Sequence, residues 1–92
     1  MRFEWDSKKD AANLRKHGIA FEDAIEIFGS PFLEGPDDRQ SGGEDRWLVL
    51  GEVRGRVIVV VYTWRGERRR IISARKAKKA EREAYYRAIY SE

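Results

Sequence analysis

The chain has 92 residues, of which 41% are hydrophobic and 38% are charged, and its formal net charge is +3. This size and composition predict one folded domain over residues 1–92 and exclude an intrinsically disordered protein. There is no cysteine, and His17 is the one histidine. Disulfides, thiolate metal sites and histidine-rich metal clusters are therefore excluded, and we expect neither a metal nor a cofactor.

Charge is divided unevenly along the chain. Residues 1–45 hold six basic and eleven acidic residues (net −5), whereas residues 46–92 hold thirteen and five (net +8), which together give +3. The division predicts an acidic end and a basic end, so that only the second half would suit a polyanion. Because the sequence has no apolar run of eighteen residues and no signal-peptide pattern at its start, we expect a soluble, cytoplasmic protein.

The first half predicts one strand, two helices and a loop. Alternation in residues 3–5 fits a short strand, and a helix over residues 7–17 follows, with Asp6 as its N-cap and Gly18 as its stop. A second helix opens at residue 20 and ends near residue 29, and residues 34–45 are a polar loop. The side chains that we expect to face the core are Ala11, Ala12 and Leu14 in the first helix and Phe21, Ala24, Ile25 and Phe28 in the second.

The second half predicts an antiparallel meander of three strands, at residues 47–53, 56–64 and 67–74, because the connections between them are short. A helix over residues 76–90 closes the chain. The fold class is therefore α+β, with the meander packed by two N-terminal helices and one C-terminal helix. We expect the three helices to cover one face of the sheet and a protein partner to cover the other. The alternative is that arginine side chains and Trp64 seal that second face.

A basic stretch follows the apolar strand segment 57–61. Nine of the eighteen residues from Arg65 to Arg82 are Arg or Lys, which indicates a surface for a polyanion, unless it is simply a solvated sheet edge and helix face. The planar guanidinium of arginine can donate two parallel hydrogen bonds to phosphate oxygens, and it can therefore stabilise the charge that develops on phosphorus when RNA is cleaved without a metal. We expect Arg65, at a strand end, and Arg75, before a helix, to be brought to neighbouring positions. Alternation places Arg70 on one face with Ile72 and Ala74.

Groups that could move protons are fewer. Glu44 and Asp38 lie in the polar loop, where a rigid scaffold often presents functional side chains. His17 is a further candidate, because histidine is the side-chain type whose ordinary pKa, about 6.5, lies nearest neutrality, although a Lys-His pair in the last turn of a helix is also favoured by the helix dipole alone.

Short motifs run in order along nearly the whole chain. They are Phe3-Glu4-Trp5-Asp6, Asn13, Lys16-His17-Gly18, Phe21-Glu22-Asp23-Ala24, Phe28, Glu44-Asp45-Arg46-Trp47, Gly51, Arg56-Val57, Tyr62-Thr63, Ile71-Ile72-Ser73-Ala74-Arg75 and Glu81-Arg82-Glu83 with Tyr85 or Tyr86. In this order the chain resembles the BrnT toxins. It departs from them at Ser7, where proline is usual, and at Gln40, near the usual place of a histidine, which weakens a proton-transfer role for that loop.

The resemblance implies the toxin of a type II toxin–antitoxin pair, with a RelE-like fold and a ribonuclease activity that stops translation. It also implies neutralisation by a cognate BrnA-like antitoxin, in a complex that we expect to be a heterotetramer. The antitoxin would carry the DNA-binding domain, so DNA would be contacted only indirectly. The family's polar motif residues match Lys16, His17, Glu44, Arg46, Arg65 and Arg75.

We therefore predict a metal-independent endoribonuclease in which Arg65 and Arg75 stabilise phosphate charge and Glu44 or His17 moves protons. The alternative is a non-catalytic module that binds RNA or the ribosome through the same basic face. The residues that we expect to contact RNA are Lys16, Arg46, Arg70, Lys78 and Arg82.

Overall fold

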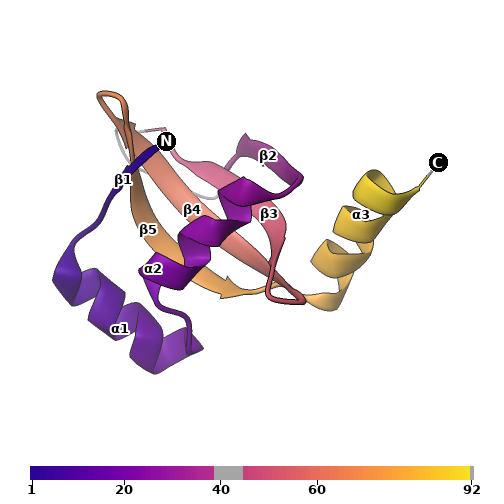
Figure 1. Ribbon diagram of the computed structural model, residues 1–92, viewed down its shortest axis with the longest axis horizontal. Helices are drawn as coiled ribbons and strands as arrows, with labels where there is room; N and C mark the ends of the chain where they lie inside the picture. The colour runs from indigo at the N-terminus through magenta and orange to yellow at the C-terminus, as the bar shows by residue number, and fades with distance from the viewer. Residues whose placement is uncertain (39–44, 92) are drawn as a thin grey trace.

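The structure, a computed structural model, describes residues 1–38 and 45–91 (Figure 1). A five-stranded sheet is flanked by helices, which confirms the α+β class. The elements are β1 (Arg2–Glu4), α1 (Ser7–His17), α2 (Phe21–Ala24), the 3₁₀ helix η1 (Ile25–Gly29), β2 (Phe32–Pro36), β3 (Trp47–Val53), β4 (Arg56–Arg65), β5 (Arg68–Lys76) and α3 (Lys79–Tyr90). No helix in this described part of the chain is long and apolar enough to cross a membrane.

The strands lie in the order β1-β5-β4-β3-β2. The antiparallel meander of β3, β4 and β5 is confirmed by their register, in which Val49 pairs with Val60 and Val60 with Ala74. The sheet has two further strands at its edges, β1 parallel to β5 and β2 antiparallel to β3. The expectation of a polar loop from residue 34 was wrong at its start, because β2 extends to Pro36. A proline is tolerated there because the strand is at the edge of the sheet.

The first helix has the predicted ends but not the predicted inner face. Asp6 accepts hydrogen bonds from the backbone N–H groups of Lys8 and Lys9, and Gly18 ends the helix at a φ of 74°. Ala11, Ala12 and Leu14, expected inside, are exposed, and the buried side chain of α1 is Asn13. Asn13 can be buried here because its side-chain amide hydrogen-bonds to backbone groups of β5 that a neighbouring strand would otherwise pair with.

The second helix is shorter than expected. Its α-helical part is α2 alone, and the chain continues as the tighter 3₁₀ helix η1. The buried residue of η1 is Ile27. Phe21 and Ala24 are fully buried as predicted, whereas Ile25 and Phe28 are only partly buried against the same cluster. A 3₁₀ helix has fewer residues per turn, so the i, i+3, i+4, i+7 pattern does not continue through it.

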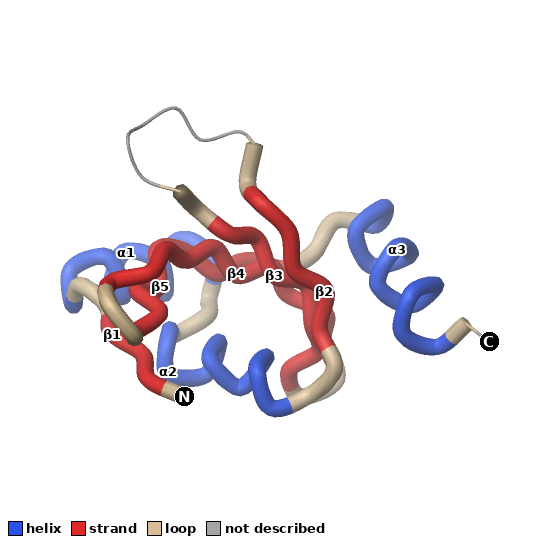
Figure 2. Tube along the Cα trace, turned by 90° about the horizontal axis from the view of Figure 1, so that it is seen from above, coloured by secondary structure: helices blue, strands red, loops and turns tan. Residues whose placement is uncertain are grey.

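Two hydrophobic clusters lie on opposite faces of the sheet. The larger one packs α2 and η1 onto one face, with Val60, Tyr62 and Ile71 beneath them. The smaller one buries Val57 and Val59 against α3, through Tyr85 and Ile89. Figure 2 shows α2 on one side of the curved sheet and α3 apart from α1 and α2, at the β2 end. The expectation that all three helices cover one face was therefore wrong, and α3 covers part of the face that we had assigned to a partner.

A β-bulge changes the facing of β5. The register shifts so that Val61 pairs with Ser73 while Tyr62 pairs with Ile71, leaving Ile72 as the extra residue. Ile71 and Ala74 consequently belong to the same cluster. The predicted grouping of Arg70 with Ala74 is wrong for this reason, because simple alternation does not hold across a bulge.

Candidate nucleic-acid interface

Four arginines of β4 and β5 lie on the face of the sheet that α3 covers in part. Residues directly opposite each other in an antiparallel pair share a face, and the pairs here are Arg65 with Arg68, Thr63 with Arg70, Val61 with Ser73 and Val59 with Arg75. Because Val59 belongs to the α3 cluster, the whole series lies on that face. We call Arg65, Arg68, Arg70 and Arg75 the arginine row.

Arg65 and Arg75 are not neighbours, contrary to our expectation. Arg75 is opposite Val59, and Arg65 lies six residues further along β4. At about 3.3 Å per residue, the two positions are about 20 Å apart. Both lie on one face, but they are at opposite ends of the arginine row, because an antiparallel hairpin brings the end of one strand beside the start of the next. A single phosphate cannot contact both.

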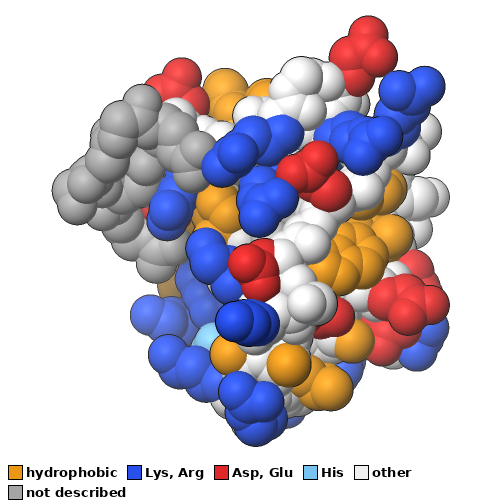
Figure 3. Space-filling model, turned by 90° about the vertical axis from the view of Figure 1, so that its left-hand side faces the viewer, with side chains coloured by type: hydrophobic (Ala, Val, Ile, Leu, Met, Phe, Trp, Pro, Cys, Tyr) orange, Lys and Arg blue, Asp and Glu red, His pale blue; other side chains and the backbone are white. Residues whose placement is uncertain are grey.

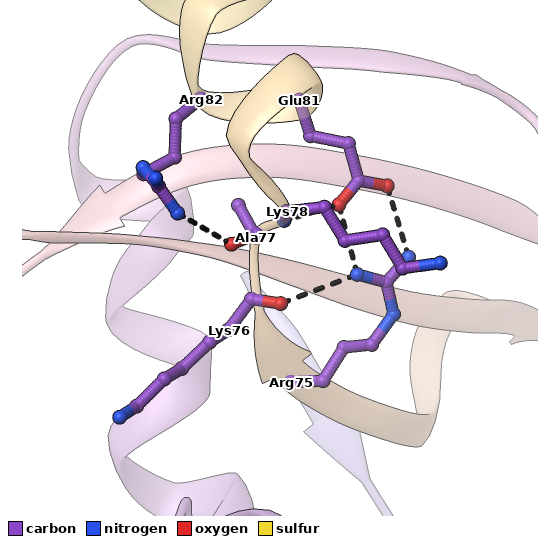
Figure 4. Close-up of polar contacts among 6 residues, drawn as sticks. All are labelled: Arg75, Lys76, Ala77, Lys78, Glu81 and Arg82. Carbon is purple, nitrogen blue, oxygen red and sulfur yellow. Dashed lines mark hydrogen bonds and ion pairs between the residues drawn. The ribbon is translucent and has the colours of Figure 1, made fainter.

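Arg75 forms the best-defined contact of the row (Figure 4). Its guanidinium donates two parallel hydrogen bonds of 2.9 Å to the carboxylate of Glu81 in α3. The same carboxylate accepts a 2.7 Å hydrogen bond from the backbone N–H of Lys78, at the start of the helix. A carboxylate of the chain itself thus occupies this helix end, and Arg75 connects the sheet to α3.

The pair has a consequence for the charge of Glu81. The hydrogen bonds from Arg75, assisted by the Lys78 N–H, lower the pKa of Glu81 to about 2 from an ordinary value of 4.5. Only 20% of the Arg75 side chain and 25% of the Glu81 side chain are exposed, so solvent screens the pair weakly.

This pKa predicts an acid-dependent loss of stability. A carboxyl group whose pKa is lower in the folded chain stabilises the fold fully above the unfolded value and loses that contribution as the pH falls through the folded value. The free energy of unfolding should therefore decline between about pH 4.5 and pH 2, by roughly 2–3 kcal/mol from this group. Urea unfolding across this range should show the decline in the wild type and in Glu83→Gln, an exposed neighbour in α3, and a smaller decline in Glu81→Gln.

The other cations that we assigned to RNA binding are distributed over several elements. Arg70 forms a 2.7 Å ion pair with Glu4 of β1. Arg46 stands directly before β3, Lys78 directly before α3, and Arg82 donates a hydrogen bond to the carbonyl of Ala77 (Figure 4). Arg46 and Arg70 lie towards the Arg65 end of the sheet, whereas Lys78 and Arg82 lie at the α3 end.

A shallow groove of about 250 Å³ separates α1 from β5. Lys16 and His17, both predicted, lie in it, together with Lys9 and Ser73, which we had not assigned a role. Figure 3 shows blue Lys and Arg side chains gathered on this side of the molecule, with the histidine among them. Ser73 could not be placed here from the sequence, because its position depends on the bulge at Ile72.

Asn13 holds the two sides of this groove, α1 and β5, together. Its side-chain amide donates 2.9 Å hydrogen bonds to the carbonyls of Ile19 and Ala74 and accepts a 3.1 Å hydrogen bond from the N–H of Ala74. The amide therefore pairs with β5 where β1 has already ended, and it holds α1 against the strand. His17, one turn later in α1, owes its place beside Ser73 to this contact.

The polar loop held two predicted groups, Glu44 and Asp38. Glu44 lies outside the described residues, and Asp38, at the edge of the loop, lines a separate pocket near Trp47. Within residues 1–38 and 45–91, no group of His, Asp and Glu side chains is arranged to hold a metal ion.

The comparisons with known proteins agree with the motifs. A search of curated sequences gives no match. The family described as the ribonuclease toxin BrnT of type II toxin–antitoxin systems matches residues 5–81, from Trp5, just before α1, through the strand β5 to Glu81 in the first turn of α3. The matched part contains the arginine row, Asn13 and the α1–β5 groove. The chain therefore belongs to the BrnT family of ribonuclease toxins of type II toxin–antitoxin systems.

Proposed function

We propose that this chain is an active endoribonuclease that cleaves RNA without a metal ion. The observation that carries the proposal is the meeting of two features at β5: the arginine row on one face of the strand and the α1–β5 groove with His17 at its edge. Ser73 is the residue that joins them, since it belongs to the row's face and also lines the groove.

The roles follow from the chemistry of RNA cleavage. The ribose 2′-hydroxyl is the nucleophile, so the protein must move protons and hold the charge that develops on phosphorus. His17 is the imidazole in the groove and would exchange protons with the ribose or the leaving oxygen. Lys9 and Lys16 beside it, and Arg75 on the strand, would hold the phosphate. Glu44 stays a candidate base, and Arg65 would bind RNA further along the row.

The alternative is a module that binds RNA or the ribosome without cleaving it. The ion pairs of the arginine row favour this alternative. Arg70 and Arg75 already contact Glu4 and Glu81, so their guanidinium groups are engaged within the fold before any phosphate binds. A phosphate that binds Arg75 must compete with a carboxylate held in two parallel hydrogen bonds.

The family assignment supports a wider proposal about biological role. Membership in a type II toxin–antitoxin family implies an antitoxin and an RNA substrate. We infer that the antitoxin is BrnA-like, that the two proteins form a heterotetramer which contacts DNA through the antitoxin, and that the toxin has a RelE-like fold and inhibits translation in the cytoplasm. Failure of the toxin to co-purify with the product of a neighbouring gene would contradict the first of these.

RNA cleavage in the presence of EDTA tests the proposed activity. Purified protein should cleave single-stranded RNA with and without the chelator, and an Arg65/Arg75 double substitution to alanine should reduce the rate by at least about 100-fold. Intact RNA at high protein concentration, with tight binding retained, would support the binding module instead.

A further inference from the structure

A second groove, apart from the one beside His17, lies at the end of the sheet where β3 begins and β4 ends. It has a volume of about 280 Å³ and is lined by Asp45, Trp47, Thr63 and Trp64. Trp47 is paired with Tyr62, so Trp64 is the diagonal neighbour of Trp47 across the two strands. Two indole side chains therefore border one opening at a spacing set by the sheet.

The Trp64 ring is both accessible and held in place. It is 44% exposed, which is unusual for a large aromatic side chain in a sheet. Tyr62 packs edge-on against it at 5.6 Å between ring centroids, and the guanidinium of Arg69 lies 4.6 Å from its centre. Arg69 also lies over Phe28 and Tyr62, so these contacts fix its guanidinium over one face of the indole, and a ligand would stack on the other face. A ring fixed in this way can stack on a ligand at little cost in side-chain entropy.

Asp45 gives the groove a polar group. Its backbone carbonyl accepts a 2.6 Å hydrogen bond from the hydroxyl of Thr63, which ties the segment before β3 to the end of β4. Thr63 is only 4% exposed, so this tie is internal to the fold. An ionised carboxylate accepts hydrogen bonds and donates none, and it therefore selects a ligand that offers N–H groups.

Cationic side chains adjoin the groove along both strands. Arg46 lies between Asp45 and Trp47 in the chain, and Arg65 directly follows Trp64. The arginine row starts at the same end of the sheet, since Arg65 pairs with Arg68, but it lies on the α3 face, opposite to the face of Trp47 and Trp64. The cations next to the groove in the chain are therefore close to its end of the sheet without lining it.

We propose that this groove binds one nucleobase of single-stranded RNA, stacked on Trp64 and hydrogen-bonded to the Asp45 carboxylate. Stacking on an aromatic side chain tolerates every base, so the carboxylate supplies the preference. Guanine carries a ring N–H beside an amino group on its Watson–Crick edge, two donors that match the two oxygens of a carboxylate. The groove therefore favours guanine next to the cleaved region, an inference that rests on the proposed ribonuclease function.

Binding of non-cleavable RNA tests the inference without requiring catalysis. The probes are fluorescent 2′-O-methyl oligonucleotides of uridine with one central guanosine, adenosine or inosine, whose hypoxanthine base lacks the amino group. Fluorescence anisotropy with the wild type should rank guanosine above inosine and inosine above adenosine. Trp64→Ala should weaken binding to all three by about tenfold or more, Trp64→Phe by less, and Asp45→Asn should remove the ranking. Tyr90→Ala, an exposed aromatic side chain of α3, is the matched control and should change neither quantity.

The outcomes separate the base site from the ribonuclease activity. Equal binding of the three oligonucleotides by the wild type, or unchanged binding by a folded Trp64→Phe and Trp64→Ala, would overturn the base site whether or not RNA is cleaved. A ranking that Asp45→Asn removes, in a protein that leaves unmodified RNA intact, would support the base site and contradict the ribonuclease. Thermal unfolding of each variant identifies any loss that comes from the fold instead.

Discussion

Replacing Asn13 by alanine should destabilise the fold by about 3 kcal/mol, because three hydrogen bonds of the buried amide are lost together. The substitution leaves both the N–H and the carbonyl of Ala74 without this partner on the α1 side of β5, and an unsatisfied buried backbone group costs more than the bond itself contributes. In a domain of this size the melting temperature should fall by roughly 15 °C. Circular dichroism during heating and urea titration measures the change.

Leu14→Ala is the control for the Asn13 substitution, since Leu14 follows it in α1 and is 49% exposed. It should change the free energy of unfolding by less than about 0.5 kcal/mol. Equal losses in the two variants would mean that α1 is held by its apolar side chains and not by the amide. Asn13→Asp keeps an acceptor for the Ala74 N–H but sets an acceptor-only oxygen against the carbonyls of Ile19 and Ala74, so its loss should be at least as large as that of Asn13→Ala.

Replacing Arg75 by alanine should reduce RNA cleavage by about 100-fold or more if its guanidinium holds the phosphate. The same substitution should also lower the free energy of unfolding by about 2 kcal/mol, because the charged hydrogen bonds to Glu81 are lost. Glu81→Gln separates the two effects, since it weakens the same pair and leaves the cation of Arg75 in place. Initial cleavage rates in EDTA and urea unfolding should be measured on both variants.

We expect Arg75→Ala, but not Glu81→Gln, to lose RNA cleavage. We expect both variants to lose stability. Cleavage by Glu81→Gln should stay within a few-fold of the wild type, or rise, because a competing carboxylate no longer holds the guanidinium in two charged hydrogen bonds. Equal losses of cleavage in both variants would mean that Arg75 acts only by anchoring α3. Glu83→Gln, with an exposed side chain in the same helix, controls for the change in net charge.

Local sequence patterns determined the elements that depend on local physics. The ends of α1 follow from Asp6 and Gly18, because a capping carboxylate and a left-handed glycine act within a few residues of themselves. The meander follows from apolar strands separated by short turns at Gly55 and Gly66, both of which adopt positive φ. The edge strand β2 was missed because Glu34, Gly35 and Pro36 have low strand propensity and are held by pairing with β3.

The candidate site could be predicted as a set of residues but not as an arrangement. Arg65 was correctly placed at a strand end and Arg75 ahead of the last helix, yet the register of β4 and β5 places them at opposite ends of one face. Glu81 was not expected to bind Arg75, because a contact between a strand and a following helix depends on how the chain turns at Ala77. The groove of Trp47 and Trp64 likewise exists only because the β3–β4 hairpin brings the start of β3 beside the end of β4 in this register.

The sequence by itself determined the class of the protein: its composition gives a small folded domain, and its ordered motifs give membership in the BrnT ribonuclease toxin family. Only the tertiary structure decided which cations share a face, which are joined to carboxylates and which face α3 covers. The physical reason is the period of a strand. One extra residue at Ile72 reverses the facing of every side chain after it, and whether a bulge forms is settled by pairing and packing across the whole sheet.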